Sequence, residues 1–204
     1  MLATEHWSLL ASRSTTQSEV LTRIAIFLTL VSAGLVTLGV LGNATQFSGW
    51  FGVAALGILF LLVVLGLITQ LRVFNTALED LAYVLAMNRL RAAYVDLDPG
   101  IRPYLMMGTT DDMPGSQQTY YPFVARDRSQ VFASSMVLIL VVHAALAGLF
   151  VGALVYTFTA SVGWSIGIGA VVVIASFVGW MAWGYRGYRA VWRLHEPLRT
   201  TDGG

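Results

Sequence analysis

The chain of 204 residues contains no cysteine and no lysine, and only 11% of its residues are charged. Without cysteine there is no disulfide, no thiolate metal ligand and no cysteine nucleophile. Soluble domains carry charge on roughly a quarter of their residues. Because charge is scarce and hydrophobic residues make up 56% of the chain, the composition indicates a membrane protein.

Long stretches without Asp, Glu, Lys or Arg occur four times in the sequence. A helix needs about 20 apolar residues to cross the hydrocarbon core of a bilayer. A charged side chain at the centre of such a helix costs about 2.5–3.5 kcal/mol. The sequence therefore predicts an all-α integral membrane protein with four transmembrane helices, at residues 24–41, 50–71, 131–158 and 164–183.

The basic residues mark one side of the predicted membrane. Arginines precede the first apolar stretch, lie between the second and third, and follow the fourth, whereas the turns at 42–49 and 159–163 carry no charge. Positively charged loops stay in the cytoplasm. We therefore expect two antiparallel transmembrane hairpins in the plasma or inner membrane, with both termini cytoplasmic. An N-terminal interfacial segment is expected at 1–23, and the two hairpins are expected at 24–71 and 131–185. A cytoplasmic helix and loop would occupy 72–130, and a basic and aromatic tail would occupy 186–204.

The cytoplasmic segment begins with a pattern typical of a helix start. Thr76 and Glu79 fit a capping box, and Pro99-Gly100 would end the helix. Residues 81–87 contain no polar side chain except Tyr83, so this predicted amphipathic helix cannot be solvated on all sides. It is expected to lie on the membrane surface, to pack under the bundle or to meet a second copy, and residues 76–98 are a possible contact for a cytoplasmic protein.

Residues 101–122 are rich in Gly, Pro, Thr and Asp and read as a loop, with one acidic pair just before it and a second pair inside it. An EF-hand requires glutamate at the twelfth position, which Met107 occupies when the loop is started at Asp96. A divalent-cation site built from both pairs is one interpretation. The other is that the acids cap a helix end and pair with arginines. The residues involved are Asp96, Asp98, Asp111 and Asp112, with Arg102, Arg126 and Arg128 as partners.

Both ends of the chain carry patterns typical of membrane interfaces. Trp7, Leu9 and Leu10 suggest a short helix among the lipid headgroups, after which Thr16 and Glu19 would start the first transmembrane helix through a second capping box. Near the other end, arginines alternate with Tyr and Trp. Next to a membrane this pattern favours lipid headgroups over nucleic acid as the partner. The headgroup-binding residues are expected to be Arg186, Arg189 and Arg193.

His143 stands alone as an ionisable residue inside a predicted transmembrane helix. Such a residue is a functional candidate by default. Thr37 and Ser176 lie at a similar predicted depth and could accept or donate a hydrogen bond, and Ser32 adds another hydroxyl. Three roles remain open for this candidate intramembrane polar site: a packing bond between helices, a proton or ion pathway, and a ligand to a bound cofactor.

Two pairs of glycines have the spacing of a helix-packing motif. Gly148 and Gly152 form a GxxxG in the third predicted span, and Gly163 and Gly167 repeat the spacing at the outer end of the fourth. Small residues at this spacing let helices approach closely. The motif predicts either a homo-oligomer or close packing within one chain.

Catalytic motifs are missing from the sequence. It contains no Gly-rich phosphate loop, no HExxH and no GxSxG, and the spans offer one histidine with scattered hydroxyls. We therefore expect a protein that is not an enzyme and holds no cofactor or metal. The predicted function is a self-associating membrane anchor, scaffold or signalling module that acts through its cytoplasmic helix. The alternative is a homo-oligomeric channel lined by hydroxyls and His143.

Overall fold

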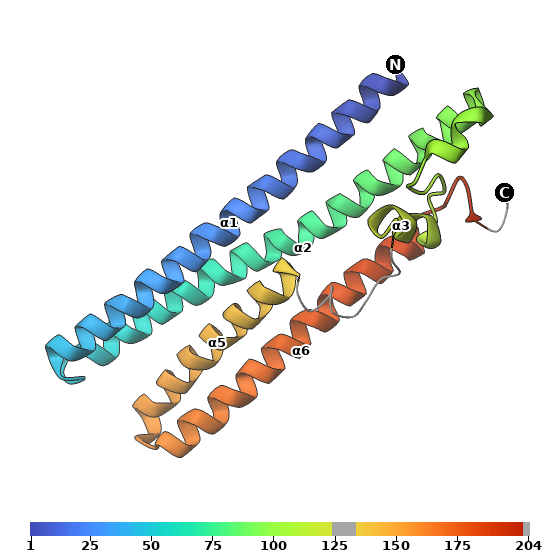
Figure 1. Ribbon diagram of the computed structural model, residues 1–204. Helices are drawn as coiled ribbons and strands as arrows, with labels where there is room; N and C mark the ends of the chain where they lie inside the picture. The colour runs from blue at the N-terminus through green and yellow to red at the C-terminus, as the bar shows by residue number, and fades with distance from the viewer. Residues whose placement is uncertain (124–133, 202–204) are drawn as a thin grey trace. The chain divides into compact units, whose positions relative to one another are not determined.

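The structure is a computed structural model that describes residues 1–123 and 134–201 (Figure 1). Val131, where the third span was predicted to begin, lies outside these residues, as do Arg126 and Arg128. Within the described ranges every regular element is helical. The elements are α1 (Leu2–Thr45), α2 (Phe51–Leu97), the 3-10 helix η1 (Pro99–Tyr104), α3 (Met113–Tyr120), α5 (Ser135–Thr159) and α6 (Val162–Leu194).

Four of these helices are long and apolar enough to cross a membrane. They are α1, α2, α5 and α6, and each overlaps one of the four predicted spans. The prediction of an all-α protein with four potential membrane-crossing helices is therefore confirmed. Such helices do not need to bury their apolar side chains inside the protein. In a bilayer a helix makes all its backbone hydrogen bonds internally, and its apolar side chains can face lipid.

Helices α1 and α2 are much longer than the predicted spans, and this corrects two predicted helix starts. α1 runs without a break for 44 residues and α2 for 47, so neither Thr16 nor Thr76 begins a helix. No glycine or proline occurs between Leu2 and Ala33, or between Leu67 and Asp98, and nothing else in these stretches stops a helix. Thr15 instead bonds back to the Ala11 carbonyl, at 3.0 Å.

The chain forms two compact units. The apolar unit comprises residues 20–74 and 134–184, and the polar unit comprises residues 1–19, 75–123 and 185–201. Two charged residues, Arg23 and Arg72, occur in the apolar unit. Helices α1, α2 and α6 each contribute residues to both units.

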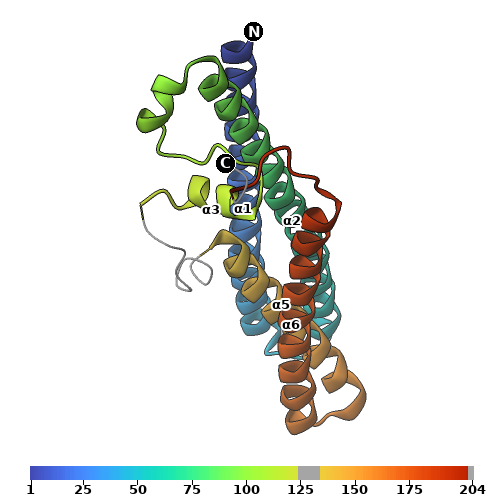
Figure 2. The same cartoon turned by 90° about the vertical axis from the view of Figure 1, so that its right-hand side faces the viewer.

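Within the apolar unit, a short turn joins α1 to α2 and another joins α5 to α6 (Figures 1 and 2). The first turn uses left-handed backbone at Gln46 and Phe47, and the Phe47 amide donates to the Gly42 carbonyl at 2.8 Å. The second uses left-handed backbone at Ala160. Helix α5 is the most buried of the four and α6 the least. The buried core residues are Val20, Ile24, Phe27, Val31, Leu59, Leu62, Val73, Ile139 and Leu146.

Two short helices occupy most of the region that was predicted to be a loop. Asp98 caps η1 by accepting from the Gly100 amide, and Asp112 caps α3 by accepting from the Gly115 amide, both at 2.9 Å. In each case an aspartate is followed within two residues by proline. This order suits a helix start, because aspartate accepts the free amides and proline fits the first turn.

The apolar stretch at 81–87 is covered by other segments of the polar unit. Leu81, Val84, Leu85 and Met87 are all buried. The next residue, Asn88, donates to the Thr110 and Gly115 carbonyls, at 2.8 and 3.1 Å, and accepts from the Thr119 hydroxyl at 2.7 Å. These bonds attach the segment from residue 110 to 119 to α2 (Figure 2).

Candidate functional site

His143 lies in the interior of the apolar unit. Its side chain projects from α5 and the residue is 5% exposed. Nε2 lies 3.2 Å from the main-chain carbonyl oxygen of Val63 on α2. Because a carbonyl only accepts, Nε2 carries the proton and donates. Nδ1 is buried and has no hydrogen-bond partner among the described residues.

A glycine on α2 makes room for this histidine. A Cβ atom at Gly66 would lie 2.7 Å from His143 Cδ2 and 2.9 Å from Phe27 Cζ, both closer than real Cβ atoms come. The Trp180 ring of α6 packs edge-on, with its centroid 6.4 Å from that of the imidazole. The imidazole is therefore enclosed by apolar and aromatic groups from three other helices.

The hydroxyls predicted to accompany His143 do not join it. Thr37 donates to the Ala33 carbonyl at 2.8 Å and Ser32 to the Leu28 carbonyl at 3.0 Å, both on the exposed side of α1. Ser176 lines a separate groove of about 420 Å³ with Leu71 and Trp180. The histidine's partner is thus a backbone carbonyl, which periodicity and depth could not identify because every helical residue carries one.

Gln70 is a second buried polar residue of the apolar unit, and the sequence analysis missed it. The residue is 1% exposed, and neither its amide nitrogen nor its amide oxygen has a partner in the described part of the chain. It lies one helical turn from Gly66, on the same face of α2. A glutamine near the end of an apolar stretch was the signal that could have found it.

The two glycine pairs have different surroundings. A Cβ atom at Gly148 would lie 2.7 Å from the Gly169 carbonyl oxygen, and one at Gly152 would lie 3.1 Å from the Ser165 carbonyl oxygen. The first pair therefore packs α5 against α6 of the same chain. For Gly163 and Gly167, no described atom lies within 4 Å of the added Cβ, so the second pair stands on an open face of α6.

The predicted headgroup-binding arginines lie on the last turns of α6. The helix continues to Leu194, so Arg186, Arg189 and Arg193 share one side at spacings of three and four residues, and all three are exposed. The Arg189 guanidinium lies 5.4 Å from the centre of the Tyr185 ring. Contact with lipid stays a prediction.

Asp111 organises the polar unit by holding the C-terminal residues. Its carboxylate accepts from the backbone amides of Leu198 and Arg199, at 3.1 and 2.8 Å, and from Nε of Arg89 at 2.6 Å. His195 Nε2 lies 2.7 Å from the Asp111 carbonyl oxygen. Burial would raise the pKa of Asp111, but the hydrogen bonds from Arg199, Leu198 and Arg89 outweigh it, so the pKa lies below its usual value.

The neighbouring Asp112 reinforces the same contact. Its carboxylate accepts from the backbone amide of Thr201 and from the hydroxyl of Thr110, in addition to capping α3. Asp96 pairs with the guanidinium of Arg199. The acids therefore cap helices and pair with arginines, although Arg89 and Arg199 are the partners rather than Arg102. No cluster of three or more metal-ligating side chains occurs in residues 1–123 and 134–201.

A second polar cluster joins α1, α2 and α3. The Asp80 carboxylate accepts from Arg13 Nε at 2.6 Å, from Gln17 at 2.8 Å and from the Tyr120 hydroxyl at 2.7 Å. Burial, followed by the bond to Asp80, raises the pKa of Tyr120. Tyr120 is therefore a hydrogen-bond donor at every physiological pH, and this cluster is structural.

Sequence reasoning found His143 and the acidic pairs but missed Gln70, Asn88 and Asp111's partners at the C-terminus. The contacts of Asp111 join residues that are 22 and more than 80 positions apart, and no local pattern predicts them. No protein-family model, curated protein or solved structure matches the chain.

Proposed function

We propose that the chain is a multi-pass protein of the plasma or inner membrane whose polar unit lies in the cytoplasm and acts as a non-catalytic interaction module. The distribution of charge supports this topology. Every Asp, Glu and Arg lies on one side of the four apolar stretches, and the turns at 42–49 and 159–163 have none. The helices then cross as two antiparallel hairpins, with both termini in the cytoplasm.

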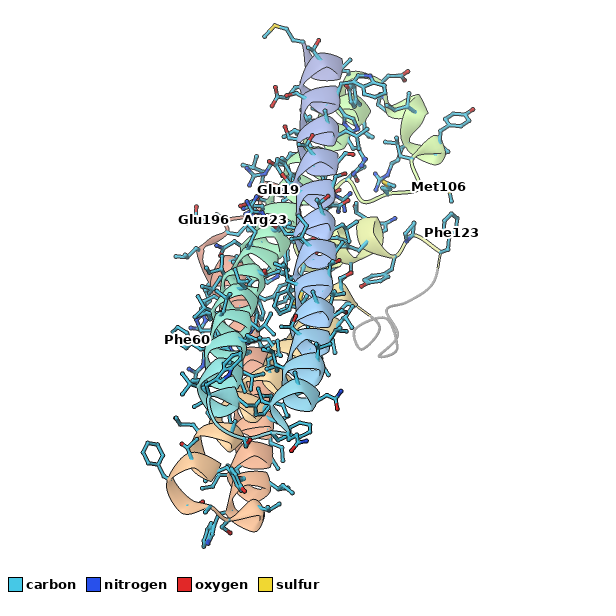
Figure 3. The ribbon with its side chains drawn as sticks, turned by 90° about the vertical axis from the view of Figure 1, so that its left-hand side faces the viewer. Glu19, Arg23, Phe60, Met106, Phe123 and Glu196 are labelled. Carbon is cyan, nitrogen blue, oxygen red and sulfur yellow. The ribbon has the colours of Figure 1, made fainter. Side chains whose placement is uncertain are left out.

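The role as an interaction module is supported by large apolar side chains that are exposed around η1. Leu97 is 74% exposed, Tyr104 is 83% exposed and Met106 is 58% exposed. The labelled side chain of Met106 projects away from the helices, as does that of Phe123 (Figure 3). Exposed apolar residues in a water-facing unit are typical of a protein contact.

The exposed residues around η1 indicate a different partner contact from the one predicted from the sequence. The sequence suggested residues 76–98, but in the middle of that stretch Leu81, Val84, Leu85 and Met87 are buried against the same unit, and Leu97 near its end is exposed. We therefore place the contact on η1 and the residues that flank it, from Leu97 to Met107. An anchor, scaffold or signalling role fits such a surface.

Self-association belongs to the apolar unit in this proposal. Gly163 and Gly167 begin a face of α6 that continues through Val171 and Ile174 at helical spacing, and both of these side chains are 65% exposed. A small-residue face of this kind permits a second copy to approach closely.

The alternative, a pore lined by hydroxyls and His143, needs these groups on one surface. His143 is enclosed inside the apolar unit, whereas Ser32 and Thr37 lie on the exposed side of α1 and are bonded to their own helix. A pore formed between copies could therefore be lined by these hydroxyls but not by the histidine. We retain the interaction module as the proposed function.

The topology is tested by labelling single cysteines, because the chain has none of its own. An impermeant thiol reagent added outside intact cells should label Ser48→Cys in the first turn and leave Gln118→Cys on α3 unlabelled. Both positions are exposed, so a difference reports the side of the membrane. Labelling of Gln118→Cys before the cells are opened would contradict the proposal.

The contact surface is tested by photo-crosslinking in cells. A benzophenone amino acid at Tyr104 should give a discrete crosslinked protein, whose identity mass spectrometry then reports. The matched control is the same group at Gln118, which is also exposed in the polar unit but lies outside the proposed contact. Equal or absent crosslinking at both positions would argue against a partner at η1.

A further inference from the structure

Arg91 is a buried cation whose partners are neutral. The residue lies on α2 within the polar unit and is 9% exposed. Nη1 donates to the Asn88 side-chain oxygen at 2.7 Å, and Nη2 lies 3.2 Å from the Met107 sulfur. In the described part of the chain, the ion pairs do not include Arg91.

Burial, and then repulsion by the guanidinium of Arg13 on α1, lower the pKa of Arg91 below the usual arginine value. Arg13 itself is paired with Asp80 at 2.6 Å, whereas Arg91 has no such partner among the described ion pairs. Burial, and then repulsion by Arg91, likewise lower the pKa of the partly buried His6 on α1. Buried charges in proteins are almost always paired, because removing an unpaired charge from water is strongly unfavourable.

Nitrogen atoms without hydrogen-bond partners also indicate a ligand-binding site next to Arg91. A guanidinium has five N–H groups, and Asn88 and Met107 engage two of those of Arg91. Nδ1 of His6 is buried without a partner among the described residues, and its ring packs on Tyr94 of α2 with the centroids 6.4 Å apart. A buried guanidinium on α2 and a partly buried imidazole on α1 therefore both have nitrogen atoms without a hydrogen-bond partner in the described part of the chain.

Asn88 holds the guanidinium in place. Both of its amide hydrogens are used, on the carbonyls of Thr110 and Gly115, so its oxygen is oriented toward Arg91 and Thr119. Met107 is 42% exposed, and movement of this flexible side chain would open the guanidinium to solvent.

We propose that the polar unit binds a phosphate group between Arg91 and His6. A phosphate supplies the missing negative charge, and its oxygens match the forked donors of an arginine. The same chemistry is carried by a soluble phosphate compound and by a phospholipid headgroup. This site is independent of the exposed surface at η1 and of self-association.

The test uses the full chain in neutral detergent, freed of phospholipid, and inorganic phosphate as the probe at constant ionic strength. Calorimetric titration should give saturable binding. Arg91→Gln should weaken it about tenfold or more, since it removes a charged donor to the anion. Arg102→Gln, which removes an exposed arginine of the same unit, should bind as the parent does.

A second arm separates the two sources of phosphate. Native mass spectrometry of protein extracted from membranes should detect a retained phospholipid that Arg91→Gln loses if a headgroup is the ligand. Arg91→Lys keeps the charge but not the fork, so it should fold as the parent does and bind with intermediate affinity. The proposal is overturned if neither phosphate nor phospholipid binds saturably, or if Arg91→Gln and Arg102→Gln behave alike.

Discussion

At the residue scale, His143 owes its position to the absence of a side chain at Gly66. The imidazole reaches the Val63 carbonyl only because α2 presents bare backbone next to it, between Phe27 and the histidine itself. A buried donor that finds a carbonyl avoids a penalty of about 1–3 kcal/mol. The histidine and the glycine therefore act as one packing unit.

Gly66→Ala should destabilise the apolar unit by about 1–3 kcal/mol, the usual cost of overpacking a core. The added methyl group would overlap the ring atoms of His143 and Phe27. Gly57→Ala is the control, because no described atom lies within 4 Å of a Cβ atom there. Thermal unfolding in detergent measures both, and an unchanged midpoint in Gly66→Ala would mean that the helices are further apart than described.

Asp111 makes the attachment of the C-terminal residues depend on pH. Its pKa in the folded protein is lowered, so the stabilising contribution is complete above the unfolded value of about 3.9 and is lost as pH falls through the folded pKa. A nitroxide on a cysteine at Thr200 should therefore be immobile at neutral pH and become mobile well below pH 4.

The same label tests the residue responsible. Asp111→Asn should mobilise it already at pH 7, because the neutral amide loses the charge-assisted bonds from Arg89 and from the amides of residues 198 and 199. Asp98→Asn, which alters only the cap of η1, should leave it immobile. If both variants behave alike, Asp111 does not hold the C-terminal residues.

At the scale of elements, α1 and α2 pass from the apolar to the polar unit as single helices. Capping-box spacing occurs in both, at Thr16 and Thr76, but a cap requires the backbone before it to leave the helical conformation. Without glycine or proline nearby, the helical hydrogen bonds continue. The Thr76 hydroxyl is left buried and without a partner among the described residues.

Ala77→Pro distinguishes a continuous α2 from a helix that starts at Thr76. Proline is favoured at the first position of a helix, so a fresh start at Thr76 predicts little effect. In a continuous helix it removes a hydrogen bond and clashes with the preceding turn, and we expect a loss of about 3 kcal/mol or more. Ala77 is exposed, so Ala77→Ser controls for side-chain packing in the same unfolding measurement.

At the scale of the whole molecule, some glycines of α5 and α6 make contacts inside the chain, and others lie on an open face of α6. Gly148, Gly152 and Gly169 bring α5 and α6 of one chain into backbone contact. The face that begins at Gly163 and Gly167 is left for lipid or for a second copy. The proposed self-association would therefore depend on α6, the least buried of the four long helices.

Gly167→Leu should weaken the oligomer and leave the fold intact, because its Cβ position is open. Gly148→Leu should destabilise each chain, because even a Cβ atom there would lie 2.4 Å from Val173 Cγ2. Mass measurement of the protein in nanodiscs reports the oligomer, and thermal unfolding reports the fold. Dissociation by Gly148→Leu with an unchanged unfolding temperature would place the interface on α5 instead.

The sequence by itself determined the helical class and the four apolar helices, because both follow from local composition: a bilayer demands about 20 apolar residues in succession, and only helices satisfy the backbone there. It also determined which residues are exceptional in an apolar setting, such as His143. Tertiary structure alone decided their partners. His143 meets the Val63 carbonyl beside Gly66, and Asp111 meets the amides of Leu198 and Arg199, in each case across 80 or more positions of the chain. The partners are backbone groups, and backbone groups carry no sequence signature.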